Sequence, residues 1–274
     1  MRWRASFIRS TGSGLAFVVL FLFSRAWAQN ASTASPMSLS PAQIVEQMQR
    51  HSQEQSERLE HYHALRHYAV EYKGYFRKIK AEMDVEVIYD AASGKSFRIV
   101  SQSGSSVLCQ KVLKRAVDSE QEAALNKDAT ALTEENYSFR LLGSGFLNDR
   151  PAYILYVEPL TESEFLYKGK IWVDAEDFAL VKLEVEPARN PSFWISRTLI
   201  QHTYAQTGGF WLPEYNRSET KVRIGGEAVM TIDYGTYQIV SKQAEREARA
   251  QPGEDQEGAK PSMGTNPSFL PMVH

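Results

Sequence analysis

Three potential metal ligands recur at intervals of four in the segment HYHALRHYAVE, namely His63, His67 and Glu71. On an α-helix this spacing would place imidazole and carboxylate groups on one face, where they could hold a zinc or copper ion. The alternation that begins at Tyr68 and Val70 predicts instead that a strand follows and that the helix ends just before it. We therefore expect a solvated helix end here and no metal. A metal protein centred on these histidines is the disfavoured alternative.

The remaining polar residues form no recognisable catalytic constellation. Asp174, Glu176 and Asp177 fall in a predicted hairpin turn, where exposed acidic residues are usual. The Gly-Ser-Gly at 143–145 lacks the helix and the lysine of a phosphate-binding loop. The serines have no histidine that spacing identifies as a partner, since His202 lies within a predicted strand. We expect no catalytic residue, no cofactor and no enzymatic activity.

The first 28 residues have the layout of a secretory signal peptide. Arginines precede the apolar run 15–23, and Ala26 and Ala28 provide small residues before a cut ahead of Gln29. The run is too short to span a bilayer, so an uncleaved anchor is the weaker interpretation. We expect cleavage after Ala28, export, and a periplasmic location.

The charge and cysteine content narrow the class of protein further. Removal of the four arginines of the signal peptide leaves 27 basic residues against 33 acidic ones, a net charge of −6 that argues against a nucleic-acid partner. The only cysteine is Cys109, so an intramolecular disulfide is impossible. Apolar neighbours around Cys109 indicate a buried, inert thiol. Stability must therefore come from burial of apolar surface, and we expect a monomer.

The elements that position these residues begin with a helix. Ser40, Pro41 and Gln43 provide an N-cap, a first-turn proline and a capping box, and the helix is predicted to continue to about Ala64. Three strands in a meander follow from residue 66 to about residue 99, because apolar residues then alternate with period two. The segment 104–125 returns to helical spacing and predicts a second helix.

Seven further strand-like segments complete the domain, at 137–147, 151–158, 165–174, 178–186, 192–207, 210–224 and 228–240. Turn residues separate them at Asn148–Asp149, Gly208–Gly209 and Gly225–Gly226, the last read as a two-residue hairpin loop. Pro213 predicts an edge or a bulge. Residues 29–39 read as a flexible lead-in and 40–240 as one domain. The charged, Pro- and Gly-rich segment 241–274 reads as a disordered tail.

The predicted sheet is too wide for its helices. About ten strands at roughly 4.8 Å each make a sheet nearly 50 Å wide, whereas two helices cover about 20 Å of it. A closed barrel, a sandwich, or a half-open barrel with helices over its mouth would each hide the apolar face. Two helices that interrupt a meander favour the half-open barrel over the sandwich.

The hairpin YKGKIWVDAEDFALVKLEVE (167–186) resembles the G-x-I-W-V-D strand-turn-strand of the outer-membrane lipoprotein-sorting superfamily, which includes LolA, LolB and RseB. GGFWLPEYNRSE and AVMTIDYGTYQI are similar to the strands that close those domains, so the resemblance covers roughly residues 40–240. It implies a mainly β fold with two helices, in which a curved antiparallel sheet forms an incomplete β-barrel capped by the helices. It also implies a role in the envelope, where the cavity shields acyl chains. No contact residue of the family aligns onto this chain.

We therefore expect a periplasmic carrier that binds lipoprotein acyl chains or a lipid and passes it between envelope partners, such as an inner-membrane transporter and an outer-membrane acceptor. The alternative is a non-enzymatic sensor or adaptor that binds proteins through the same scaffold. Apolar residues on the inward phase of the strands are the predicted lining of the cavity: Tyr68, Val70, Tyr72, Phe76, Val85, Val87, Phe97, Ile99, Phe139, Leu141, Leu155, Ile171, Val173, Val181, Leu183, Met230 and Ile232.

Overall fold

The structure is a computed structural model that describes residues 39–241, with the exception of 191 and 224. The predicted signal peptide, nearly all of the lead-in and nearly all of the tail therefore lie outside the described residues. The domain begins with α1 (Pro41–Arg58), β1 (Leu59–Lys73), β2 (Lys78–Asp90) and β3 (Gly94–Gly104). A helical segment follows, with α2 (Ser106–Leu108), the π-helical turn η1 (Cys109–Leu113), α3 (Lys114–Leu125) and α4 (Lys127–Thr130).

The remaining elements are all strands. They are β4 (Tyr137–Leu147), β5 (Arg150–Pro159), β6 (Tyr167–Asp174), β7 (Leu180–Pro187), β8 (Ile195–Thr207), β9 (Phe210–Val222), β10 (Glu227–Asp233) and β11 (Tyr237–Ser241). The predicted strand 228–240 is thus two strands, because the chain turns at Gly235, whose φ is +62°. The backbone N–H of Gly235 donates to the side chain of Asp233 in this turn.

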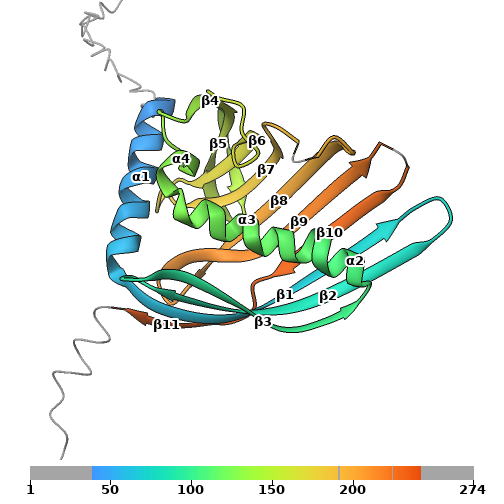
Figure 1. Cartoon of the computed structure of the whole chain (residues 1–274). Coiled ribbons are helices and arrows are strands. Elements are labelled where there is room, and N and C mark those ends of the chain that lie inside the picture. The colour runs from blue at the N-terminus through green and yellow to red at the C-terminus, as the bar shows by residue number, and fades with distance from the viewer. Residues whose placement is uncertain (1–38, 191, 224, 242–274) are drawn as a thin grey trace, which may run out of the picture. The chain divides into compact units, whose positions relative to one another are not determined.

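One antiparallel sheet contains every described strand, in the order β3-β2-β1-β10-β9-β8-β7-β6-β5-β4, with β11 paired to the first part of β1. Its edges, β3 and β4, do not pair with each other, so the sheet stays open. The helical segment α2–α4 joins these two edges by crossing the concave face of the sheet, and α1 lies beside it (Figure 1). The predicted mainly β fold, a curved open sheet capped by helices, is confirmed.

The first helix starts as predicted and ends earlier. The Ser40 hydroxyl accepts from the Gln43 N–H at 3.3 Å, and the Gln43 side chain accepts from the Ser40 N–H at 2.9 Å, which completes the capping box. The prediction that α1 continues to Ala64 is wrong. Leu59 is already extended, and Ala64 is fully buried between β2 and β11, so tertiary burial takes these residues into the sheet. Among residues 39–241, apart from the two gaps, no helix combines the length and the hydrophobicity needed to cross a bilayer.

The predicted turns form with one exception. Asn148 and Asp149 both have positive φ (50° and 63°), as the two-residue loop between β4 and β5 requires. Gly208 and Gly209 do the same between β8 and β9. The loop between β9 and β10 spans 223–226, so the two-residue loop predicted there is wrong. The ladder shifts register beside Pro213, which confirms the predicted bulge.

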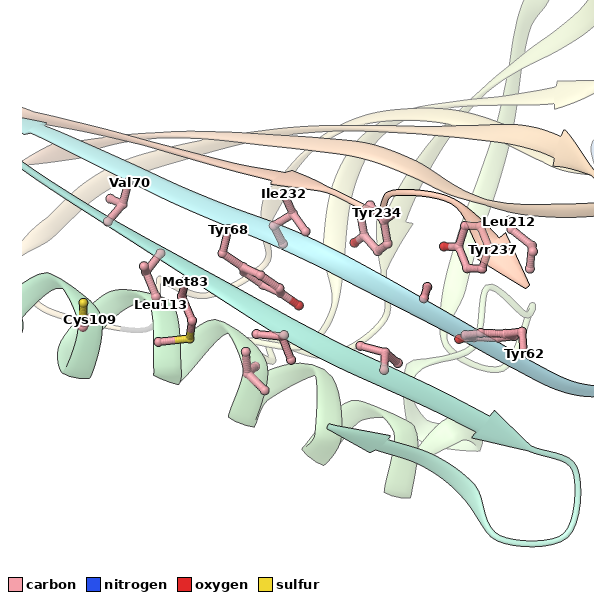
Figure 2. Packing of buried hydrophobic residues seen from close by; sticks show 14 of the residues in the cluster. Tyr62, Tyr68, Val70, Met83, Cys109, Leu113, Leu212, Ile232, Tyr234 and Tyr237 are labelled. Atoms are coloured by element: carbon pink, nitrogen blue, oxygen red, sulfur yellow. The ribbon is translucent and has the colours of Figure 1, made fainter. Parts of the chain in front are cut away.

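The apolar core consists of two separate clusters. The first lies between the sheet (β1, β2, β10, β11 and the start of β9) and the crossing helices, and Figure 2 shows Met83 of β2 close to Leu113 of η1. The second lies between α1 and β4–β7, where Ile44, Val45 and Met48 pack on residues such as Leu155. We call them the crossing-helix cluster and the α1 cluster. The first helix and the crossing helices thus each cover a different half of the sheet.

Candidate ligand-binding site

The structure buries most of the predicted cavity lining but divides it between the two clusters. The crossing-helix cluster takes eight of these residues: Tyr68, Val70, Tyr72, Val85, Val87, Phe97, Met230 and Ile232. The α1 cluster takes six: Phe139, Leu141, Leu155, Ile171, Val173 and Leu183. Val181 is also buried, but it belongs to neither cluster. That any of them contacts a ligand stays a prediction.

Two of the predicted lining residues are exposed. Phe76 is fully exposed because it lies in the turn between β1 and β2, where the strand alternation has ended. Ile99 pairs with the buried Val85, but it lies on the edge strand β3 and keeps 41% of its surface exposed. The structure therefore places Phe76 and Ile99 outside the buried interior, and that they line the cavity stays a prediction.

A polar strip separates the two clusters along the inner face of the sheet. It consists of three inward residues of β8 and their partners on β9, and we call it the seam: Thr198, Ile200, His202, Asn216, Ser218 and Thr220. Ile200 pairs with Val185 of β7, and Ser218 pairs with Met230 of β10, so the seam faces the same side as both clusters. Apart from Thr198, whose hydroxyl bonds to that of Thr220, the seam residues are only partly buried. The helices therefore cover the middle of the inner face least.

A buried charge lies next to the seam. Arg66 is in phase with the inward residues of β1 and has no exposed surface. Its Nη1 donates to Glu120 Oε2 of α3 at 2.7 Å, and Lys95 Nζ of β3 lies 3.2 Å from Glu120 Oε1. Burial raises the pKa of Glu120, but the two cations outweigh this and the net shift of its pKa is downward. The ion triad thus ties the crossing helix to two strands.

Stacked aromatic rings connect this triad to the seam. The guanidinium carbon of Arg66 lies 4.4 Å from the centre of the Tyr234 ring. His202 stacks on Tyr234 at 5.4 Å and on Tyr204 at 4.6 Å. Burial lowers the pKa of His202 to about 4, so its imidazole is neutral at pH 7. Burial likewise raises the pKa of Tyr68 to about 12, which keeps its hydroxyl protonated.

The seam and its surroundings contain orphaned polar atoms. Nε and Nη2 of Arg66, the Tyr68 hydroxyl and Nε2 of His202 are buried and have no hydrogen-bond partner in the described part of the chain. Buried polar groups are normally paired, so this concentration at one place is unusual. Such an arrangement can hold a guest that has an apolar body and a polar acceptor group.

Two surface depressions lie away from this region. One, of about 400 Å³, is between α1 and residues 133–135. The other, of about 610 Å³, is at the hairpin tips beside Tyr75 and Arg223. Neither is lined by seam residues.

The histidines considered for metal binding lie on a strand. His63, His67 and Glu71 occupy the outer face of β1, where residues four apart are separated by roughly 13 Å. His63 pairs with Glu86 and His67 with Asp84, at 3.1 and 2.8 Å. The expected solvated helix end is therefore wrong. Within residues 39–241, less the two gaps, no three His, Cys, Asp or Glu side chains are grouped to hold a metal.

Sequence reasoning missed the polar members of the site. Arg66 shares its phase with Ala64 and Tyr68, so a charged residue on an inward position was visible, but the strand was expected to begin only there. His202 was placed correctly in a strand. The pairing of Glu120 with Arg66 depends on how α3 crosses the sheet, so no short sequence pattern around either residue predicts it.

No family model matches the chain, and no curated protein sequence matches it either. Solved structures do match. A DUF1329 family protein from Desulfovibrio piger has a TM-score of 0.38 and 13% identity over 73% of this chain and 94% of its own. A LolA superfamily protein from Nitrosomonas europaea has a TM-score of 0.33 and 13% identity over 74% and 94%. A putative outer membrane lipoprotein-sorting protein domain from Vibrio parahaemolyticus has a TM-score of 0.35 and 12% identity over 77% and 94%.

Proposed function

We propose that the protein is a non-enzymatic carrier of the bacterial periplasm, which binds an acyl chain of a lipid or lipoprotein along the seam and passes it between envelope partners. The observation that carries this proposal is the partly covered seam between two apolar clusters. A chain laid along it would contact Val185 and Ile200 on one side and Met230 on the other. Each methylene removed from water contributes about 0.8 kcal/mol, so a sixteen-carbon chain gains roughly 12 kcal/mol before ordering costs.

A guest that extends from the seam beneath the crossing segment α2–α4 requires this segment to move, because the side chains there are buried. That segment contacts the sheet through one narrow apolar face with Leu108, Leu113 and Val117, and its other face is polar. Its π-helical turn at Cys109–Leu113 is an irregularity that often accompanies function in helices. A narrow contact of this kind can open at lower cost than the sheet itself.

The test is ligand occupancy with a matched pair of variants. Protein purified from periplasm is examined by native mass spectrometry for bound lipid, and a neutral fluorescent dye is displaced by long-chain amphiphiles. Ser218→Trp fills the seam and abolishes binding, whereas Glu219→Trp, the next residue on the opposite face, keeps it. A wild-type protein that is empty and binds no amphiphile contradicts the proposal, and so does equal binding by both variants.

A protein-binding adaptor is the second candidate, and exposed aromatic residues at the hairpin tips favour it. Tyr75, Phe76, Phe193 and Trp194 expose between 54% and 100% of their surface. They are contiguous, because the Arg223 N–H donates to the Trp194 carbonyl at 2.8 Å, its guanidinium covers Phe193, and Tyr75 packs on Gly225. This surface suits a protein segment with acidic and apolar residues. If it is the whole function, Phe76→Ser with Trp194→Ser abolishes partner binding and Ser218→Trp changes nothing.

A further inference from the structure

The ion triad of Arg66, Lys95 and Glu120 holds more positive than negative charge. Arg66 and Lys95 share a single carboxylate, that of Glu120, at 2.7 and 3.2 Å. The side chain of Arg66 has no exposed surface, and that of Lys95 is 29% exposed. The triad therefore carries one net positive charge, and one of its two cations is wholly buried. A buried charge without a full set of partners destabilises the folded state, and a second anion bound beside Arg66 would reduce this destabilisation.

Hydrogen-bond donors that could bind such an anion are present beside the triad. Nε and Nη2 of Arg66 lie on the edge of the guanidinium that Glu120 does not use, and both lack a partner in the described chain. The hydroxyl of Tyr68, two residues along the same face of β1, makes no hydrogen bond of regular geometry, although it lies close enough to the Arg66 guanidinium for this cation to oppose the rise of its pKa. Arginine presents adjacent N–H groups in a fork that matches the two oxygens of a carboxylate.

Tyr234 links these donors to one end of the seam. Tyr234 covers the Arg66 guanidinium and stacks on His202, a seam residue that is only partly buried. An acyl chain lying along Ile200 and His202 would therefore carry its head group toward Arg66. The phase of β1 fixes this position, since Arg66 faces inward with Ala64 and Tyr68.

We propose that the interior is a subsite for long-chain carboxylates, in which the head group accepts hydrogen bonds from Arg66 and Tyr68 while the acyl chain occupies the seam. This rests on the proposed carrier function and specifies its ligand as a singly charged anionic amphiphile. One negative charge matches the single excess positive charge of the triad. An uncharged amphiphile of the same length forms no charge-assisted hydrogen bond with Arg66 and Tyr68, so it binds more weakly.

The experiment compares palmitate with hexadecanol, each displacing a neutral dye from the full-length protein below its aggregation concentration. Palmitate should bind at least about tenfold more tightly, the ratio expected for one charge-assisted hydrogen bond. Arg66→Met keeps the apolar stem and removes this preference without weakening hexadecanol. Equal affinities for the two ligands in the wild type overturn the subsite and leave the carrier function intact. Failure of both ligands to bind overturns the carrier function and the subsite together.

A second variant keeps the inference testable if Arg66→Met does not fold. Glu120→Gln preserves shape and leaves Arg66 and Lys95 without their carboxylate, so palmitate binds several-fold more tightly while hexadecanol is unchanged. Unchanged palmitate affinity in folded Glu120→Gln overturns the subsite. Circular dichroism establishes that each variant is folded.

Discussion

Asp174 is the most deeply buried carboxylate of the hairpin that first indicated the fold, with 1% of its surface exposed. Burial alone would raise its pKa, but Arg150 donates to both carboxylate oxygens at 2.6 and 2.8 Å. The backbone N–H groups of Glu176 and Asp177 donate as well, and the net shift of its pKa is downward. The acidic turn expected to be simply exposed is thus partly a buried, ionised anchor.

We expect Asp174→Asn to destabilise the domain by about 2 to 4 kcal/mol, because it leaves Arg150 and two backbone donors without a charged acceptor. The folded pKa lies below the unfolded value, so the stabilisation is present above that unfolded value. It is lost as the pH falls through the folded pKa. Urea unfolding at several pH values checks this. The exposed Glu176→Gln is the control, and a constant gap between wild type and Asp174→Asn down to pH 2 would contradict the ion pair.

His202 gives the seam a pH dependence of the same direction but in a higher pH window. Burial lowers its pKa from 6.5 to about 4, so between these values the unfolded chain binds a proton that the folded chain does not. Stability therefore falls as the pH drops from 6.5 to 4, by at most about 3 kcal/mol. His202→Gln should flatten this part of the profile in thermal unfolding. Ser218→Ala, a seam variant without a titratable group, should keep the wild-type slope.

Residue types alone could not identify this polar interior. The alternation of β1 tells which side chains face inward, and it includes Arg66 once the strand is known to start at Leu59. It does not tell what meets them. Glu120 is 54 residues away, and Tyr234 reaches the site from the other end of the chain. These are long-range contacts set by topology.

Among the elements, the β6–β7 hairpin shows why one glycine of its motif is needed. Gly169 has a φ of +144°, and a Cβ there would lie 2.4 Å from the carbonyl oxygen of Glu184 on β7. Gly169→Ala should therefore cost about 2 kcal/mol or more of unfolding free energy, because the two strand backbones would have to separate. Gly145→Ala on β4 is the matched control, since its new methyl group would meet only Ile154, at 3.6 Å. Equal stability of the two variants would show that no close backbone approach exists.

Local signals predicted the beginnings of elements better than their ends. The capping box at Ser40 and the paired turn residues at Asn148–Asp149 act within a few residues, and both were predicted from sequence. The end of α1 at Arg58 and the break before β11 were not. Both depend on pairing with distant strands: β11 adds to β1 at Tyr62 and Ala64, which draws these residues out of a helix.

At the scale of the domain, the excess of apolar sheet over helix was a correct guide to the fold but not to its interior. It left a closed barrel, a sandwich and a half-open barrel, and the resemblance of the 167–186 hairpin implied the last, which the open curved sheet with helices across its face confirms. The single apolar cavity it suggested is instead two packed clusters and a polar seam. The division arises because β9 presents Asn216, Ser218 and Thr220 inward, a polar phase that alternation alone could not distinguish from an outward one.

A guest that binds only the folded domain must also stabilise it. Ligand at one hundred times its Kd adds about 2.7 kcal/mol, which for a domain of this size raises Tm by roughly 5 to 10 °C. Thermal unfolding of the wild type at increasing palmitate should therefore give a Tm that rises with the logarithm of ligand concentration. Ser218→Trp should show no such rise, whereas Glu219→Trp should follow the wild type. A rise of the same size in Ser218→Trp would place the guest outside the seam, and a flat Tm in all three would mean that the folded domain holds no acyl chain.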